Sequence, residues 1–403
     1  MALVSMRDML YHAYENNYAV GAFDLVSLDF LEAVIDAAES SRSSVILSIA
    51  EPHFAYYDFE LLLSAVETAA KRATVPVAIQ LDHGSSMETV VKAINLGCNG
   101  VMLDASNQEF SENIDKTRAV CEMAHQCGVS VVGELGYVAG IEGEGAELHP
   151  GETAFTIPSE AKAYVEKTGV DFLAVSIGTV QGRMSGRAKL DYVRLKQLNQ
   201  AINIPLVIHG GSGLNEDQFH KLTSNGVAKI DYFTALSDVA AKAMRDRSKS
   251  NPNGSFADLK KDVKEAVKAE VQRCLRQWGS AGRAAEVLER CEPWLPVEHL
   301  IIHNVNSSAV QSFDAIMYEG KNILINIPGV REVFTGEAMQ ENSRYNFCWS
   351  VRFTHKAALE SFLEHQGFKN FLKKQFDSSV SDLICVDYQE KALPIFSKQL
   401  VSK

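Results

Sequence analysis

The sequence predicts an α/β protein, a (β/α)8 TIM barrel followed by a smaller α+β domain with ferredoxin-like order. Short runs rich in Val, Ile and Ala recur eight times in the first 235 residues, and segments with helical apolar spacing separate them. Strands of a parallel sheet are buried on both faces and have this composition, and eight strand-helix repeats close into a barrel. A flat doubly wound sheet is the alternative.

Length and composition set the broad class. The chain has 403 residues, enough for two or three domains of roughly 150 residues each. Hydrophobic residues make up 46% and charged residues 22%, close to the globular average, which argues against disorder. Asp and Glu outnumber Lys and Arg by 51 to 39, a net charge of −12, so the surface repels phosphate backbones and we expect no nucleic-acid partner.

The cysteines and the N-terminus indicate the compartment. The seven cysteines are scattered and form no CxxC pair, which is typical of reduced thiols in a cytoplasmic protein. Arg7 and Asp8 interrupt the apolar start too early for a signal peptide. No run approaches the roughly 18 uncharged apolar residues that a membrane span requires. We expect a cytoplasmic protein with no membrane partner.

The eight apolar runs are the expected barrel strands, and polar residues follow each of them. The runs are VGAF, SVILSIA, PVAIQL, GVMLD, SVVGEL, DFLAVSIG, PLVIHG and AKIDYFT, in chain order. In a barrel the carboxyl ends of all strands meet at one mouth, where active sites form. Polar residues also surface at strand ends without any function, but eight in register make that explanation weaker. The residues expected at the mouth are Asp24, Glu51, Asp82, His83, Asp104, Glu134, Gln181, His209 and Asp231.

Beyond the barrel, the sequence predicts a helix, a linker and a second domain. The turn-rich SNPNGSF precedes an amphipathic helix expected from Ala257 to about Trp278. Residues 287–296 include two prolines and are typical of a linker. Within residues 297–392, four strands (HLIIHNV, INIPGV, NFCWSVRF, LICVDY) and two helical regions predict ferredoxin-like β-α-β-β-α-β order. Such a sheet usually buries its open face by pairing, so we expect a homo-oligomer.

Three of these strand ends carry residues suited to catalysis. Asp82 and His83 are adjacent, which allows an acid/base carboxylate beside an imidazole ligand, although an exposed loop pair is the simpler explanation. His209 precedes the glycine-rich Gly210–Gly213, whose backbone N–H groups could hold an anion at the start of a helix. Glu134 precedes a long acidic glycine-rich stretch, which could be a ligand-binding segment or a solvated linker.

Taken in order, these motifs resemble class II, zinc-dependent ketose-bisphosphate aldolases of the fructose- and tagatose-bisphosphate type. The resemblance rests on LDHGSSMETVVKAINLGCNGVMLDAS, GELG, IGTVQG, PLVIHGGSG and WGSAGRA, and it covers about residues 1–286. Residues 297 to about 392, with IPGV, Trp349, Phe353 and VDY, look like a stress-responsive dimeric A/B barrel domain. That family is ferredoxin-like and typically dimerises face to face.

The resemblance implies an aldol or retro-aldol reaction in which a divalent metal, expected to be zinc, polarises a ketone and stabilises an enediolate. By position, His83 and His209 match two metal ligands and Asp82 matches the proton-transfer carboxylate, with Asp104 and Glu134 as acidic residues near the metal. The small-molecule substrate of such an enzyme is phosphorylated. The residues that match its phosphate-holding groups are Gly182, Gly210, Gly211, Ser212 and Thr234.

Several positions depart from the family pattern. Gln181 stands where a third histidine ligand is expected, and Ser185 replaces a lysine, although Arg183 lies close by. Asp24 and Asp231 each replace an asparagine. A carboxylate about 4 Å from a phosphate charge costs roughly 4 kcal/mol at an effective dielectric near 20. Unless Asp231 is protonated or paired with Arg183, we therefore expect an altered substrate that Asp24, Gln181, Arg183 and Asp231 help to bind.

The metal set and the function each leave alternatives. His83, His209 and Glu134 form a two-histidine, one-carboxylate set suited to zinc, iron or manganese. Gln181 could instead supply a weak ligand, or Asp82 and Glu134 could act without a metal. The first functional hypothesis is an aldolase-like carbon–carbon lyase with catalytic Asp82 and Glu134. The second is a catalytically degenerate homologue that binds a metabolite or serves in assembly.

Overall fold

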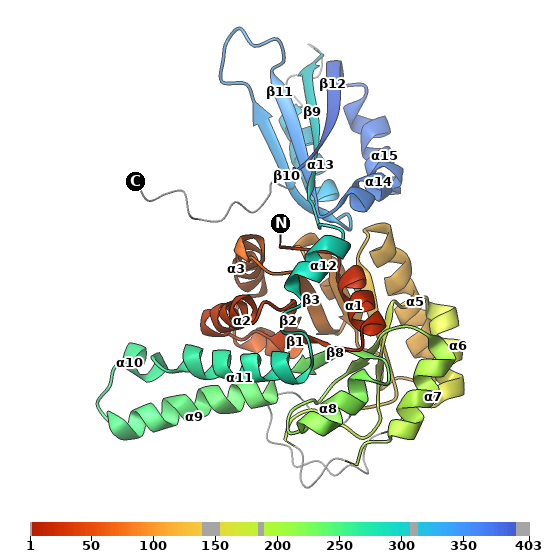
Figure 1. Cartoon of the computed structure of the whole chain (residues 1–403). Coiled ribbons are helices and arrows are strands. Elements are labelled where there is room, and N and C mark those ends of the chain that lie inside the picture. Colours follow the sequence, from red (N-terminus) through yellow and green to blue (C-terminus); the bar gives the residue numbers. More distant parts are fainter. Residues whose placement is uncertain (1, 139–153, 184–188, 307–312, 392–403) are drawn as a thin grey trace.

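A computed structural model describes residues 2–138, 154–183, 189–306 and 313–391 and confirms a closed parallel barrel followed by a smaller sheet domain (Figure 1). Each barrel strand pairs in parallel with the next, and the eighth pairs with the first. All eight are buried along their length apart from one residue of β3, as expected from their Val, Ile and Ala content. They are β1 (Val20–Asp24), β2 (Val45–Ala50), β3 (Val77–Gly84), β4 (Gly100–Leu103), β5 (Ser130–Leu135), β6 (Phe172–Val175), β7 (Leu206–Ile208) and β8 (Val227–Tyr232).

Helices surround the barrel, and polar caps start several of them. Ser27, Ser86 and Asn215 each accept a hydrogen bond from a backbone N–H in the first turn of α2, α4 and α8, respectively. The helices around the strands are α2 (Leu28–Ser41), α3 (Phe59–Arg72), α4 (Met87–Asn95), α5 (Phe110–Gln126), α6 (Pro158–Thr168), α7 (Tyr192–Ile202), α8 (Glu216–Thr223) and α9 (Thr234–Ser250), with the short 3-10 helix η1 (Glu51–Ala55) after β2.

The barrel interior is apolar at one end and polar at the other. Inward-facing Ala22, Met102 and Val132 pack with α1 (Met6–Glu15), which covers the amino ends of the strands. Two residues further along each of these strands, the next inward-facing positions are Asp24, Asp104 and Glu134. The apolar layer supports the polar layer from below, so the acidic side chains face the mouth.

The helix expected from Ala257 to about Trp278 is two helices, α10 (Phe256–Lys260) and α11 (Val263–Gln277). The buried stripe of α11 begins only at Val263 and continues through Val267 and Val271, whereas α10 buries no residue. The prediction from periodicity joined the two helices, because it did not show that the charged residues before Val263 have no apolar surface to pack against.

The linker expected at 287–296 begins later than predicted. Helix α12 (Ala284–Arg290) occupies its first four positions, because Val287 is buried with α1. The proposed domains remain residues 1–286 and 297–392, of which residues 1 and 392 lie outside the described chain.

The second domain has one four-stranded antiparallel sheet with the order β10-β11-β9-β12. Its strands are β9 (Val297–Val305), β10 (Val330–Glu337), β11 (Phe347–Phe353) and β12 (Val380–Gln389). The strand expected at INIPGV starts only at its last residue, Val330, because Pro328 lacks an N–H and Gly329 has φ of 84°. Helices α13 (Phe313–Leu324), α14 (Lys356–Glu364) and α15 (Gln366–Phe371), followed by a π-helical turn (Leu372–Phe376), pack on one face.

The second domain docks at the end of the barrel opposite the mouth. Asn95, which ends α4, donates to the Ile325 carbonyl and accepts from the Gly329 N–H, at 3.2 and 2.7 Å. Arg331 pairs with Glu67 of α3. Helices run back toward the amino ends of the strands, so these contacts leave the mouth uncovered by the second domain (Figure 1). No helix in the described part of the chain is long and apolar enough to cross a membrane.

Candidate active site

The end of β3 turns Asp82 and His83 toward the same space. Successive residues of a regular strand point to opposite faces, but the pairing of β3 with β4 shifts register between Leu81 and Gly84. His83 adopts a left-handed backbone with φ of 47°, which is uncommon for a residue with a side chain. Glu51 accepts hydrogen bonds from the Ser85 N–H and hydroxyl, and it therefore holds the turn that follows.

Polar neighbours fix both side chains. The Gln80 amide donates to Asp82 Oδ1 at 3.1 Å, and His83 Nδ1 lies 2.9 Å from Asp104 Oδ2. Burial alone would raise the pKa of Asp82, but the nearby imidazoles and an ammonium outweigh it and hold that pKa below its ordinary value. Burial would lower the pKa of His83, yet the Asp82 and Asp104 carboxylates raise it well above its ordinary value.

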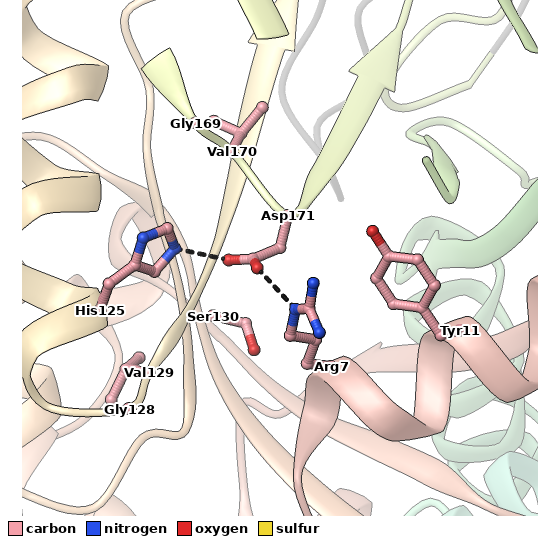
Figure 2. A pocket seen from close by; sticks show the side chains of 9 residues that line it. All are labelled: Arg7, Tyr11, His125, Gly128, Val129, Ser130, Gly169, Val170 and Asp171. Atoms are coloured by element: carbon pink, nitrogen blue, oxygen red, sulfur yellow. Dashed lines mark hydrogen bonds and ion pairs between the residues drawn. The ribbon is translucent and has the colours of Figure 1, made fainter. Parts of the chain in front are cut away.

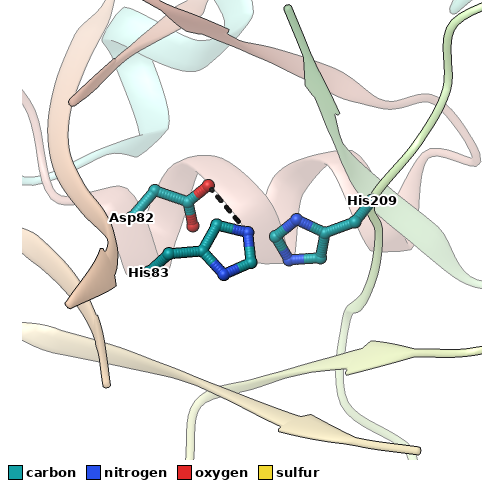
Figure 3. Close-up of side chains that lie close together, drawn as sticks. All are labelled: Asp82, His83 and His209. Atoms are coloured by element: carbon teal, nitrogen blue, oxygen red, sulfur yellow. Dashed lines mark ion pairs between the residues drawn. The ribbon is translucent and has the colours of Figure 1, made fainter. Parts of the chain in front are cut away.

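His209 faces this pair across the mouth, with two further carboxylates beside it. The His83 and His209 rings are 4.7 Å apart between centroids, and Figure 3 shows them side by side with Asp82. His209 Nε2 lies 3.8 Å from Glu134 Oε2 and 3.7 Å from Asp231 Oδ2. All three side chains are buried, and none of these atoms has a hydrogen-bond partner among the described residues.

Burial and neighbouring charges shift the pKa values of two further ionisable groups at this site. Burial, reinforced by the charge of Asp104, raises the pKa of Glu134 to about 8, so this carboxyl carries a proton at neutral pH. Burial lowers the pKa of His209, although nearby carboxylates oppose that change, so its imidazole is neutral. A neutral imidazole is the form that binds a metal, so a metal at this site would displace the proton that the neighbouring carboxylates favour on His83.

These side chains fit a divalent metal. Asp82, His83 and His209 present ligand atoms within 4.8 Å of one another, and so do His83, Asp104 and Glu134. His209 and Glu134 also offer buried atoms with no protein partner in the described chain, which a cation would satisfy. Imidazole with carboxylate suits zinc, iron and manganese. Gln181 lies near the same atoms, with its amide nitrogen 3.2 Å from His83 Nε2.

A glycine-rich turn lies beside the histidines. Gly210 has φ of 72°, and a Cβ there would overlap the Val180 carbonyl, so this position requires glycine. The Ser212 hydroxyl accepts from the Ala235 N–H at 3.2 Å, which ties the turn to the first turn of α9. Thr234, the first residue of that helix, is buried. The turn therefore stands against a helix N-terminus, the part of a helix that attracts anions.

Sequence comparison places the barrel in a family. Residues 4–283 match the family described as class II fructose-bisphosphate aldolase. The chain belongs to this family. Residues 297–390 match a second family, the stress-responsive A/B barrel domain, as the sequence motifs indicated.

Curated relatives and solved structures agree with this class II aldolase assignment. The chain is 38% identical over 296 residues to a fructose-bisphosphate aldolase of Geobacillus stearothermophilus, covering 71% of this chain and all of the relative. A probable fructose-bisphosphate aldolase of Bacillus subtilis is 39% identical over 290 residues, covering 70% of this chain and all of that protein. The crystal structure of the YdjI aldolase from Escherichia coli K12 superposes with a TM-score of 0.62 and 33% identity, covering 70% of this chain and 99% of that one.

Two of the residues predicted to bind substrate have other partners. Arg183 is exposed and pairs with Asp238 of α9, so it does not balance the charge of Asp231. Asp24 is buried at the end of β1, where its charge contributes to the raised pKa of Tyr57 after burial itself. The acidic stretch after Glu134 and the position of Ser185 lie outside the described residues. Gly182, with φ of 87°, lies just before that gap.

Sequence reasoning missed two side chains on the floor of this candidate site. Lys229 of β8 is fully buried and donates to Asp231 Oδ1 at 2.5 Å. Gln80 holds Asp82 in the same way. A lysine inside a run otherwise typical of a buried strand, two residues before an expected mouth residue, was the available signal.

A cavity of about 450 Å³ at the other end of the barrel is separate from this site (Figure 2). Asp171 lies in it and accepts from Arg7 Nε at 3.1 Å and from the Val131 N–H at 2.8 Å, and its other close contact is His125 Nε2 at 2.8 Å. These bonds tie α1 and α5 to the start of β5. At the amino ends of barrel strands such a network serves stability.

Proposed function

We propose that this chain is a metal-dependent aldehyde-lyase that breaks or forms a carbon–carbon bond next to a ketone, on a substrate other than the usual ketose bisphosphates. The convergence of Asp82, His83, His209 and Glu134 at one barrel mouth is the observation that supports it most strongly. A divalent metal, with zinc as the first candidate, would polarise the substrate carbonyl and stabilise the charge that develops on it. His83, His209 and Glu134 are its proposed ligands.

Asp82 is the proposed proton-transfer group, and Glu134 is the second catalytic carboxyl. Gln80 fixes Asp82 Oδ1 and leaves Oδ2 open, 3.7 Å from His83 Nε2. Its lowered pKa keeps it ionised and able to take a proton from a substrate hydroxyl. Without a metal, burial raises the pKa of Glu134 to about 8; as a ligand of a divalent metal this carboxylate would be ionised. The turn at Gly210, Gly211 and Ser212, with Gly182 and Thr234, is the proposed cradle for an anionic substrate group.

Asp231 and Gln181 support a changed substrate. Asp231 adds a carboxylate on the floor beside His209, balanced by Lys229 and not by Arg183. The compensated carboxylate offers one oxygen as a hydrogen-bond acceptor for a hydroxyl, ammonium or amide. The Gln181 amide also favours a second candidate function, a degenerate homologue that binds a metabolite, because it contacts the His83 nitrogen that faces the site.

The chain is also proposed to act as a cytoplasmic homo-oligomer joined through its second domain. The sheet face away from the helices exposes Phe334, Ile384, Val386 and Tyr388. Ile384, Val386 and Tyr388 follow one another along one face of β12, and exposed apolar side chains in such a row are typical of a pairing surface. All seven cysteines are free thiols, in keeping with a reducing compartment.

Cleavage assays on the full chain test the lyase. We expect aldehyde release from at least one ketose or ketose monophosphate after addition of zinc or manganese, loss of the activity with a chelator, and lower rates with fructose and tagatose bisphosphates. Asp82→Ala should lower kcat by about 10²- to 10⁴-fold, because it removes the proton-transfer group. Asp246→Asn, on the exposed part of α9, is the control and should leave kcat unchanged. Unchanged turnover in Asp82→Ala would refute the assignment, and no cleavage of any ketose would favour the degenerate homologue.

A further inference from the structure

The floor of the site contains a buried ion pair whose purpose the reaction alone does not explain. Lys229 is fully buried, and its Nζ donates to Asp231 Oδ1 at 2.5 Å. Burying two charges is costly, and a pair of apolar residues in the same space is often at least as stable. The pair is therefore weak evidence of a stabilising role, and its position under His209 is the more informative feature.

An irregularity in β8 aims Lys229 into the barrel. Leu206 pairs with Val227, but the next residue of β7, Val207, pairs with Lys229, so Ala228 is an extra residue in β8. Bulges of this kind redirect a side chain and are frequent next to active sites. Lys229 then points inward, and Asp231, two residues further along the same strand, shares its face, so the lysine reaches the carboxylate from below.

The two histidines of the site differ in how they are held. His83 has a fixed ring, because its Nδ1 lies 2.9 Å from the Asp104 carboxylate. His209 has no hydrogen-bond partner on either nitrogen in the described chain. The two carboxylate oxygens near its Nε2 belong to Glu134, itself a candidate metal ligand, and to Asp231. Asp231 belongs to neither group of side chains whose spacing suits a metal.

We propose that Lys229 and Asp231 are positioning residues for His209. Lys229 holds Asp231 by one oxygen, and the other oxygen lies 3.7 Å from His209 Nε2, where a small turn of the ring would let it accept the Nε2 proton and leave the buried Nδ1 for the metal. Asp104 plays the same part for His83, whose Nδ1 it already contacts. Metal-binding histidines generally have such a carboxylate behind them, and its removal typically lowers metal affinity by 10- to 100-fold. This inference rests on the proposed function, since it assumes that His209 binds the metal.

Zinc affinity, measured by competition with a chelator, tests the pair. We expect Asp231→Asn to bind zinc about tenfold more weakly than the wild type. Because this variant leaves the buried Lys229 ammonium without its partner, its metal-free thermal midpoint should also fall, so the zinc affinity of the folded protein is the deciding measurement. Asp104→Asn should weaken binding similarly through His83, and Asp246→Asn on the exposed part of α9 should not change it. A purely structural pair would shift the thermal midpoint and leave the zinc affinity of the folded protein as it was.

The lysine needs a second variant, because Lys229→Met leaves a buried carboxylate unpaired and can prevent folding. Lys229→Met/Asp231→Asn removes both charges and should fold, with the zinc affinity of Asp231→Asn alone if Lys229 acts through Asp231. Wild-type zinc affinity in Asp231→Asn would overturn the proposed role of the pair, and so would a double variant that binds zinc more weakly than Asp231→Asn does. The lyase proposal would stand in both cases. A wild-type chain that binds no zinc overturns both.

Discussion

At the scale of single residues, the site depends on carboxylates that are each held by one oxygen. Gln80 holds Asp82 and Lys229 holds Asp231, and each carboxylate presents its other oxygen 3.7 Å from a histidine nitrogen. A side chain anchored in this way keeps its orientation without help from a ligand. The arrangement accounts for two polar side chains, Gln80 and Lys229, in the barrel interior.

The residue types at the mouth could be predicted from the sequence, but their partners could not. Asp82, His83, Glu134 and His209 follow apolar runs, and strand ends of a barrel converge, so their meeting was foreseeable. The pairing of Asp231 with Lys229 was missed, although residues two apart on a strand share a face. The shift that places Lys229 opposite Val207 could not be predicted. A register shift is set by neighbouring strands and leaves no periodic signal in one sequence.

At the scale of elements, tight contacts between loops shape the anion cradle, and Gly210 tests them. We expect Gly210→Ala to lower the free energy of unfolding by about 2 kcal/mol or more, because φ of 72° is strained for alanine and the new Cβ overlaps the Val180 carbonyl. Urea denaturation measures this loss.

Gly213 provides the matched control for that experiment. It has φ of 88°, but a Cβ there meets nothing within 4 Å, so Gly213→Ala should cost only the backbone strain of roughly 1 kcal/mol. Equal losses in the two variants would show that the contact between the two loops does not constrain the turn.

The same elements show where periodicity fails. The eight strands were recognisable as buried apolar runs, yet INIPGV was predicted as a strand from composition although Pro328 and Gly329 delay β10 to Val330. The sequence predicted one helix before the linker where the structure has two, α10 and α11. The alternating charges continue across Lys261 and Asp262, but the buried apolar stripe does not. The ends of such helices and strands depend on which residues are buried, and burial can be inferred from a sequence only indirectly.

At the scale of the whole molecule, Glu67 and Arg331 join the two domains. Burial would raise the pKa of Glu67, but its bonds to Arg331 and Lys71 outweigh burial and hold that pKa at about 2, against an ordinary 4.5. A lowered pKa stabilises the folded state above pH 4.5, and this contribution is lost as the pH falls toward 2. We expect Glu67→Gln to cost up to about 3 kcal/mol at neutral pH and progressively less between pH 4.5 and 2.

Urea titrations of both proteins at several pH values measure this difference. Glu60→Gln, which removes an exposed pair with Lys92, is the control and should change stability by less than about 1 kcal/mol. A difference between wild type and Glu67→Gln that stays constant down to pH 3 would contradict the role of this pair.

The open sheet face makes a prediction about assembly. Val386 is 38% exposed in the single chain, so Val386→Asp should fold, yet it would place a charge inside a paired interface. Sedimentation equilibrium should give a dimer or larger oligomer for the wild type and a smaller species for the variant. Leu61→Asp, at a 74% exposed position of α3, should assemble as the wild type does. A variant with wild-type mass would place the interface elsewhere.

The metal content of the purified full chain tests the central claim most directly. Inductively coupled plasma mass spectrometry, before and after incubation with zinc or manganese, should find about one divalent ion per chain in the wild type and almost none in His83→Ala/His209→Ala. A wild-type chain that retains no ion under either condition, or a double variant that retains as much as the wild type, would contradict a metal centre at this mouth.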